Sequence, residues 1–199
     1  MKRRAWQSVA VSLALIFLSA AVTVHAGEPL DIVKSAAERT IAVLKDPNLK
    51  TPDKKKERVE RLKEIINPLF DYEEMARRTL GAHWRRRTPV EQQEFPKLFR
   101  AFLEKMYSDR IDLYESERVV FGRETFDQEY AEVESKLINA KNDESPVIYR
   151  LKRTDGKWKV YDAVIANVSI VNNYRSQFDR VISKSSYEEL KKLLKEKAG

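Results

Sequence analysis

Apolar residues in the first half of the chain recur at spacings of three and four, the period of an amphipathic helix. One such stripe covers residues 30–44, and a second follows Thr51-Pro52, where proline suits the first helical position. Asp71 and Thr88 each precede a glutamate by three residues, which is the spacing of a capping box. The pattern therefore predicts four helices, and the last of them is long, rich in phenylalanine and covers residues 88–114.

The period changes to two in the second half, where apolar and polar residues alternate and β-branched and aromatic side chains are frequent. Asp155-Gly156 is a two-residue hairpin signal, and Ser169 and Ser186 are suited to cap two C-terminal helices. Helices followed by consecutive strands indicate an α+β fold in which a curved antiparallel sheet packs against helices. The alternation predicts strands at residues 118–125, 129–140, 147–154 and 157–166.

The N-terminus has the three parts of a secretory leader. Lys2-Arg3-Arg4 precedes an apolar run at residues 9–24, and Ala26 ends a small-residue cleavage site. A retained membrane anchor is the alternative, but the run is shorter than the ~20 residues that a spanning helix needs. We expect residues 1–26 to be removed. Residues 27–199 then form one α+β domain, with a helical N-terminal half and strands at about 116–166, that works outside the cytoplasm.

Few residues are candidates for chemistry. His83 is the only histidine after the leader and the chain has no cysteine, so we expect no metal site. No nucleophile elbow, phosphate-binding glycine loop or dinucleotide fingerprint is present. Pairs of carboxylates such as Glu73 and Glu74 fall at helix starts, where the helix dipole favours them. We therefore expect no catalytic residue and no cofactor.

The charge balance constrains the partners only loosely. The chain has 38 basic and 31 acidic residues, a net charge of +7, and the leader contains three of the basic residues. This excess suits anionic lipid head groups or an acidic partner, and it is equally compatible with an ordinary solvated surface. Nucleic acid is not an expected partner outside the cytoplasm.

One face of the predicted sheet is apolar, and we expect it to meet the phenylalanine-rich helix. Periodicity alone fits a filled core as well as a lined cavity. The residues that alternation assigns to this face are Val133, Leu137, Tyr149, Leu151, Trp158, Val160 and Val164.

Residues 160–178 read VYDAVIANVSIVNNYRSQF, a strand end, a capped turn and an Asn-Tyr-Arg helix in that order. This segment resembles the signature of the MlaC family, also called the toluene-tolerance auxiliary family. The similarity continues upstream through FDYEEMA at 70–76, LGAHW at 80–84 and FPKLF at 95–99, and so covers nearly the whole chain after the leader.

The resemblance implies a nuclear-transport-factor-like cone with added helices and no enzyme activity. It implies a periplasmic carrier with bound phospholipid as cargo. Such a carrier exchanges lipid with an outer-membrane lipoprotein complex and an inner-membrane ABC transporter complex, and so maintains outer-membrane lipid asymmetry. A hopanoid or another lipid is an alternative cargo, and a periplasmic enzyme on a cone-like scaffold is an alternative function.

A carrier of this kind needs dry walls, because a ~16-carbon chain left in water costs on the order of 12 kcal/mol at ~0.8 kcal/mol per methylene. Arg85, Arg86 and Arg87 are candidates for head-group or partner contact, with a solvated turn as the alternative. Arg175 is a further candidate, with a structural role for Asn173-Tyr174-Arg175 as the alternative. The candidate lining residues are Phe99, Phe102, Val133, Leu137, Tyr149, Val160, Val164 and Val168.

Overall fold

The computed structural model describes residues 28–109 and 118–199, so the expected leader at 1–26 and the end of the predicted helix 88–114 lie outside the described residues. Helices form the first half, as predicted. They are α1 (Glu28–Lys45), η1 (Pro47–Leu49), η2 (Pro52–Lys54), α2 (Lys55–Ile66), α3 (Tyr72–Leu80), η3 (Gly81–Arg86) and α4 (Pro89–Ser108), where η marks a 3-10 helix.

The strands and the last two helices follow. They are β1 (Arg118–Asp127), β2 (Tyr130–Ile138), β3 (Glu144–Thr154), β4 (Lys157–Ile165), β5 (Val168–Ser169), α5 (Ile170–Lys184) and α6 (Tyr187–Ala198). Each strand pairs antiparallel with the next, in the order β1-β2-β3-β4-β5. Asp155 and Gly156 both have positive φ, as the hairpin between β3 and β4 requires. The α+β class and the antiparallel sheet are confirmed.

Side-chain caps fix the helix starts that the sequence predicted. At α4 the Glu91 N–H donates to Thr88 Oγ1 (3.2 Å) and the Thr88 N–H donates to Glu91 Oε2 (2.7 Å), a complete capping box. At α3 the Asp71 carboxylate accepts from the Glu74 N–H (2.9 Å), but the Glu74 side chain is turned to Arg77 and Arg78 instead of back to the cap. The cap at Asp71 is therefore single, not a box.

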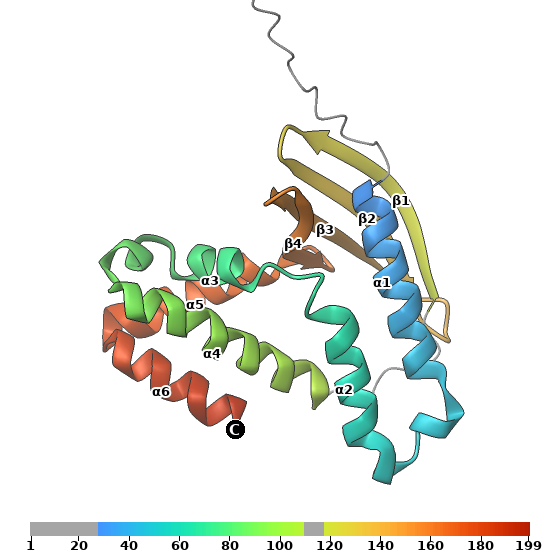
Figure 1. The fold of residues 1–199 in the computed structure, drawn as a ribbon, viewed down its shortest axis with the longest axis horizontal. Coiled ribbons are helices and arrows are strands. Elements are labelled where there is room, and N and C mark those ends of the chain that lie inside the picture. Colours follow the sequence, from blue (N-terminus) through green and yellow to red (C-terminus); the bar gives the residue numbers. More distant parts are fainter. Residues whose placement is uncertain (1–27, 110–117) are drawn as a thin grey trace, which may run out of the picture.

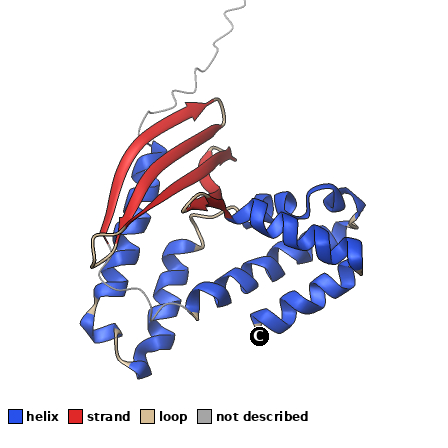
Figure 2. Ribbon diagram, turned by 180° about the vertical axis from the view of Figure 1, so that it is seen from behind, coloured by secondary structure: helices blue, strands red, loops and turns tan. Residues whose placement is uncertain are grey.

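The elements form two parts joined at an angle (Figure 1). In one part α1 lies along one face of the sheet, and in the other α3, α4, α5 and α6 pack on one another. The turn between α2 and α3 is tied to β4, since the Val160 N–H donates to the Leu69 carbonyl (2.9 Å) and the Asp71 N–H to the Val160 carbonyl (2.8 Å). Figure 2 shows the same separation from behind. The short connection near Leu69 thus joins the two parts, together with the packing of α5 and α3 on β4.

The phenylalanine-rich helix does not cover the sheet as the sequence led us to expect. α4 packs mainly against α3 and α6, and α1 takes its place on the sheet. Phe95, Phe99 and Phe178 are almost fully buried in this helical cluster, where Phe178 meets both other rings edge-on at centroid distances of 6.0 and 5.7 Å. The stripe on α4 correctly indicated a buried face, but it did not indicate which partner buries it.

A bulge in β4 reverses the alternation that the sequence suggested. Val160 is opposite Leu151 and Asp162 is opposite Arg150, so Tyr161 is an extra residue with no partner of its own. Beyond it Ala163, not Val164, continues the face of Val160. The structure therefore places Val164 on the opposite face of the sheet from the one predicted.

Candidate functional site

An apolar hollow of about 290 Å³ lies between α1, α2 and the sheet, and we call it the main hollow. No acidic or basic side chain lines it. Its lining residues are Val33, Ala36, Ala37, Thr40, Ile41, Leu44, Leu62, Ile66, Leu69, Phe70, Tyr107, Val119, Leu137, Val147, Tyr149, Ala163, Ile165 and Ile170. A concave surface of this composition suits an apolar ligand.

The sequence of α1 explains why packing is tight at one end of this helix and open further along. Near its start the Leu30 N–H donates to Glu124 Oε1 of β1 (2.7 Å), and Val33 is buried against the sheet in a cluster that includes Val133 and Val160. Val33 is also the first α1 residue in the wall of the main hollow, and the next two, Ala36 and Ala37, have small side chains that leave space between α1 and the sheet.

A second hollow of about 340 Å³ adjoins the first, and we call it the side hollow. Ile165 and Val168 are 43% and 55% exposed, so this region opens to solvent beside the end of β4. Both hollows are lined by Ile66, Phe70, Tyr107, Ile165 and Ile170. The lining of the side hollow also contains Tyr72, Met75, Leu103, Met106, Val168, Asn173 and Tyr174. The two hollows therefore share part of their walls and lie side by side, and the side hollow has an exposed margin.

Tyr107 is among the residues that line both hollows. Its hydroxyl oxygen is buried and makes no hydrogen bond to the described part of the chain. Burial raises the pKa of Tyr107 above its ordinary value, so the phenol is neutral and keeps its proton. A buried donor without an acceptor is unfavourable.

The structure brings together only some of the predicted lining residues. Leu137 and Tyr149 line the main hollow and Val168 lines the side hollow. Val133 and Val160 are fully buried in the packed cluster under the first turns of α1. The remaining predicted residues lie away from both hollows: Phe99 and Phe102 belong to the helical cluster, and Val164 is on the other face of the sheet.

Sequence reasoning missed the contribution of α1, including Ala37 and Ile41, and the position of Tyr107. The stripe of α1 showed an apolar face, but we expected the phenylalanine-rich helix, and not α1, to cover the apolar face of the sheet. No pattern in the sequence distinguished Tyr107 from the buried residues around it.

The candidate arginines divide into two groups. Arg87 is turned toward α6, with its guanidinium 4.2 Å from the centre of the Tyr187 ring and 3.4 Å from Glu91 Oε1. Arg85, Arg86 and Arg175 line a separate polar hollow of about 640 Å³. His83 Nε2 lies 2.8 Å from Asp179 Oδ1 and so joins η3 to α5 beside this group. Among the described residues no cluster of potential metal ligands occurs.

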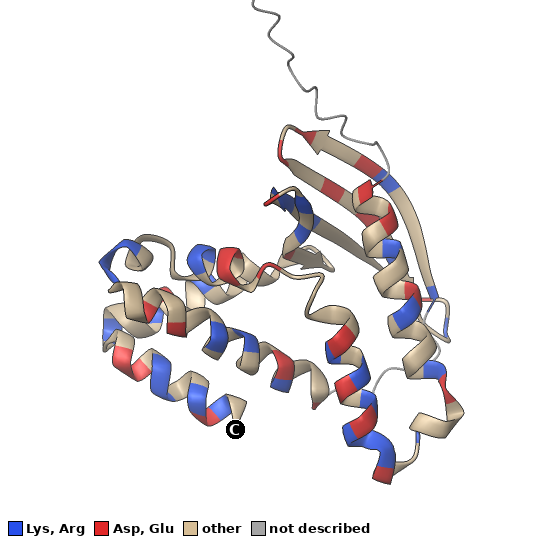
Figure 3. Ribbon diagram, in the orientation of Figure 1, with Lys and Arg blue, Asp and Glu red and all other residues tan. Residues whose placement is uncertain are grey.

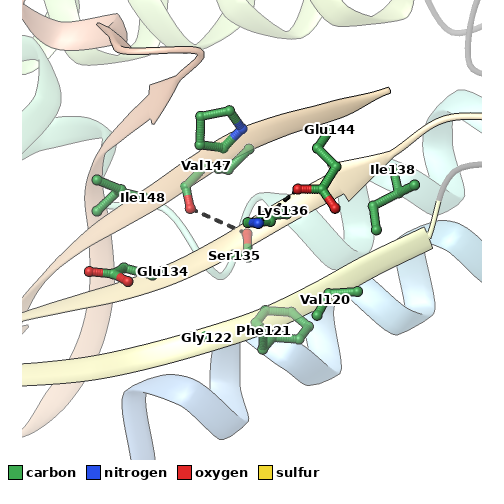
Figure 4. A pocket seen from close by; sticks show the side chains of 11 residues that line it. Val120, Phe121, Gly122, Glu134, Ser135, Lys136, Ile138, Glu144, Val147 and Ile148 are labelled. Atoms are coloured by element: carbon green, nitrogen blue, oxygen red, sulfur yellow. Dashed lines mark hydrogen bonds and ion pairs between the residues drawn. The ribbon is translucent and has the colours of Figure 1, made fainter. Parts of the chain in front are cut away.

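One further depression, of about 380 Å³, lies over β1, β2 and β3 (Figure 4). Val120, Gly122 and Ile148 form part of it, but the Lys136–Glu144 ion pair (2.7 Å) also lines it. An acyl chain placed there would meet both charges, so the main hollow is the better apolar site.

None of the helices within residues 28–109 and 118–199 has both the length and the apolarity to cross a bilayer. An α+β scaffold whose helices and sheet enclose an apolar hollow defines a class of binding proteins for apolar ligands. The particular family follows from sequence comparison: residues 34–196 match the family described as MlaC protein, and the chain belongs to that family.

Two relatives extend this result. The chain is 20% identical over 200 residues to the intermembrane phospholipid transport system binding protein MlaC of Haemophilus influenzae, covering 93% of this chain and 89% of that protein. Its fold is similar to that of the phospholipid-binding protein from Ralstonia solanacearum, solved in complex with a phospholipid. The TM-score is 0.74 at 25% identity, with 86% of this chain and 97% of that one covered.

Proposed function

We propose that this protein is a periplasmic phospholipid carrier and that the two neighbouring hollows hold the acyl chains of its cargo. The observation that carries the proposal is this pair of apolar hollows, which share lining residues, have no charged side chain in their walls, and have the exposed residues Ile165 and Val168 at the margin. The phospholipid in the structure of the Ralstonia relative supports it. No catalytic step is assigned to any residue.

The energetics favour sequestration of the chains and exposure of the head group. Each ~16-carbon chain gains on the order of 12 kcal/mol by leaving water. We assign one chain of a diacyl lipid to the main hollow and the other to the neighbouring side hollow. At the exposed margin near Ile165 and Val168 the head group would remain in solvent, so no charged side chain is required to bind it.

Tyr107 gives this arrangement a polar contact. Tyr107 lines both hollows, its hydroxyl has no hydrogen-bond partner among the described residues, and we place the glycerol ester carbonyls of a diacyl lipid beside it. A hydrogen bond from the phenol to an ester oxygen would orient the lipid without selecting its head group.

The transport cycle belongs to the same proposal. We infer that the leader is cleaved near Ala26 and that the protein moves lipid between an outer-membrane lipoprotein complex and an inner-membrane ABC transporter complex, which maintains outer-membrane asymmetry. The name of the Haemophilus relative, a binding protein of an intermembrane phospholipid transport system, supports this role.

The test uses two neighbouring residues on opposite faces of β4. Ala163→Trp places an indole in the main hollow, whereas Val164→Trp places the same group on the other face. The proteins are purified, extracted with organic solvent, and their lipids are quantified by mass spectrometry. We expect near-stoichiometric diacyl phospholipid in the wild type and in Val164→Trp, and strongly reduced lipid in folded Ala163→Trp.

Lipid-free wild type that takes up no lipid from vesicles would contradict the carrier function. Recovery of a hopanoid instead of a phospholipid would keep the site and change the cargo. Equal lipid in the two folded variants would show that the cargo lies outside the main hollow.

A further inference from the structure

Five arginines surround the polar hollow between α3, η3 and α5, and we call them the arginine cup: Arg77, Arg78, Arg85, Arg86 and Arg175. The rest of its lining is Gly81, Ala82 and Trp84, and no carboxylate lines it. Figure 3 shows basic residues along α3 and η3, at the left-hand end of the molecule. No residue of this polar hollow lines the main hollow, which lies beside α1 and the sheet.

Two of the cup arginines are held in place by their Nε atoms. Arg78 donates through Nε to Glu74 Oε1 (2.8 Å) and lies 4.0 Å from the centre of the Tyr161 ring. Arg175 donates through Nε to the Arg78 carbonyl (2.7 Å), near the C-terminal end of α3. Because both hydrogen bonds use Nε, they do not involve the terminal amino groups of Arg78 and Arg175. Such anchored guanidiniums are suited to bind phosphate oxygens.

Gly81 ends α3 with a φ of +53°, a backbone conformation that favours glycine. The Arg175 side chain passes this position, since a β-carbon added to Gly81 would be at an ordinary contact distance of 3.7 Å from its Cδ and Nε. The Arg175 side chain thus crosses the end of α3 and reaches the carbonyl of Arg78.

Glu74 neutralises only part of the positive charge of the arginine cup. Glu74 is buried and accepts hydrogen bonds from both Arg77 and Arg78, so one carboxylate serves two guanidiniums. Arg85 and Arg86 are exposed on η3. The cup therefore attracts anions beyond the ion pairs already formed.

The surroundings indicate a membrane surface in preference to an acidic protein. Trp84 is half-buried within the cup lining, and Val90, the most exposed large apolar residue described, follows shortly after η3 at 62% exposure. Arginine beside tryptophan and an exposed aliphatic side chain is the composition of a bilayer interface contact.

We propose that the arginine cup docks the protein on an anionic bilayer by binding lipid phosphate groups, at a surface separate from the cargo cavity. This inference goes beyond the carrier function and does not depend on which lipid is carried. Arg87, which is occupied by Tyr187 and Glu91, is not part of the docking surface.

The test measures binding to vesicles. Wild-type protein is mixed with vesicles of phosphatidylcholine alone or of phosphatidylcholine with phosphatidylglycerol, and bound protein is separated by flotation. The cup variant is Arg85→Glu/Arg86→Glu. The control is Lys192→Glu/Lys195→Glu on α6, which changes the net charge equally at exposed lysines outside the cup.

We expect the wild type to bind the anionic vesicles and not the neutral ones, and added salt to weaken this binding. The cup variant should bind at least about tenfold more weakly, whereas the control should stay within about twofold of the wild type. Three results would overturn the proposal: equal binding to neutral vesicles, equal weakening by the control, or binding of soluble acidic polypeptide with no binding to anionic vesicles.

Lipid extraction from the same preparations separates this proposal from the carrier function. Arg85 and Arg86 line neither apolar hollow, so the cup variant should retain its cargo. Loss of vesicle binding with cargo retained supports the docking surface. Loss of cargo together with vesicle binding would assign these arginines to the cargo site and contradict a separate docking surface.

Discussion

The helical part and the sheet part both bury a wide apolar surface, but the centre of the helical part is filled by aromatic rings, whereas the main hollow lies beside the sheet. In the helical part, aromatic rings from α4 and α5 interlock at centroid distances of 5.3–6.0 Å, as between Phe102 and Tyr174 or Phe95 and Phe178. In the sheet part, α1 touches the sheet at Val33 and then leaves the main hollow beside it. Apolar composition alone therefore does not tell a core from a cavity.

The difference lies in the size and geometry of the facing side chains. Helices that present phenylalanine to each other fill the space between them, and close packing supplies most of the stability there. Two of the α1 residues that face the hollow are Ala36 and Ala37, and these small side chains leave part of the space open. We infer that the aromatic cluster of the helical part provides most of the stability, and that the space for a ligand lies beside the sheet and along the adjoining margin of α4 and α5.

Of the changes considered, truncation of a buried aromatic ring in the helical part should lower the free energy of unfolding most. Phe99→Ala removes a fully buried ring with aromatic neighbours on two helices, so we expect a loss of about 3–5 kcal/mol in the free energy of unfolding. Denaturant unfolding measures this loss. The folded fraction should still contain lipid, because Phe99 lines neither hollow. A small change in stability would mean that the helical cluster is not solid.

Acid should weaken the helical part through Glu74. Burial raises the pKa of this carboxyl, but hydrogen bonds from Arg77 and Arg78 outweigh it and hold the pKa below its ordinary value of 4.5. The stabilisation is therefore present above about pH 4.5 and is lost as pH falls through the lower, folded-state pKa. Unfolding should be measured at a series of pH values.

Glu74→Gln provides the control for the acid effect. We expect it to lower stability by about 1–3 kcal/mol at neutral pH and to reduce the further loss in acid. The main hollow has no ionisable carboxyl in its lining, so lipid content in the folded protein should not follow the same titration. If Glu74→Gln loses as much stability in acid as the wild type, other carboxyls are responsible for the acid sensitivity.

Truncation of a wall residue should have a smaller effect on stability than truncation of the core. Ile41 is half-buried on α1 and faces the main hollow, so fewer packed atoms surround it than surround Phe99. We expect Ile41→Ala to lower stability by about 1 kcal/mol and to weaken lipid retention during delipidation. A loss as large as that of Phe99→Ala would indicate that α1 is packed as tightly as α4.

Removal of one oxygen should have the smallest effect on the fold. Tyr107→Phe deletes a buried hydroxyl that has no hydrogen-bond partner in the described residues, so the delipidated protein should keep its stability to within about 1 kcal/mol. If the hydroxyl binds an ester carbonyl, the lipid-loaded variant should gain less from cargo than the wild type. Melting of both proteins with and without lipid measures the difference. Equal stabilisation by lipid would contradict the hydrogen bond.

The features that were predicted from the sequence are those that depend on residues close together in the chain. The caps at Thr88, Ser169 and Ser186 and the turn at Asp155-Gly156 are formed as expected, and the strands begin and end within three residues of the predicted limits. These features depend on side chains close in sequence, so a short pattern contains most of the information that determines them.

The candidate site was less predictable because it depends on distant segments. Alternation put Leu137 and Tyr149 on the sheet face that lines the main hollow, but the single extra residue at Tyr161 moved Val164 to the other face. The choice of α1 instead of α4 as the cover of the sheet is set by packing across the whole chain. The apolar stripe that contains Phe99 and Phe102 shows that α4 has a buried face, but it does not show whether that face packs on the sheet or on other helices.

The hydrogen bond from Leu30 to Glu124 also affects the order of folding, because it joins residues 94 positions apart. Loop closure over such a separation is entropically unfavourable, and non-local contacts of this kind form late. One wall of the hollow comes from the start of the described chain, and the opposite wall reaches Ile165 of β4 and Ile170 of α5. A chain emerging N-terminus first therefore has no enclosed interior until its last strands arrive, and cargo can enter only a nearly finished fold.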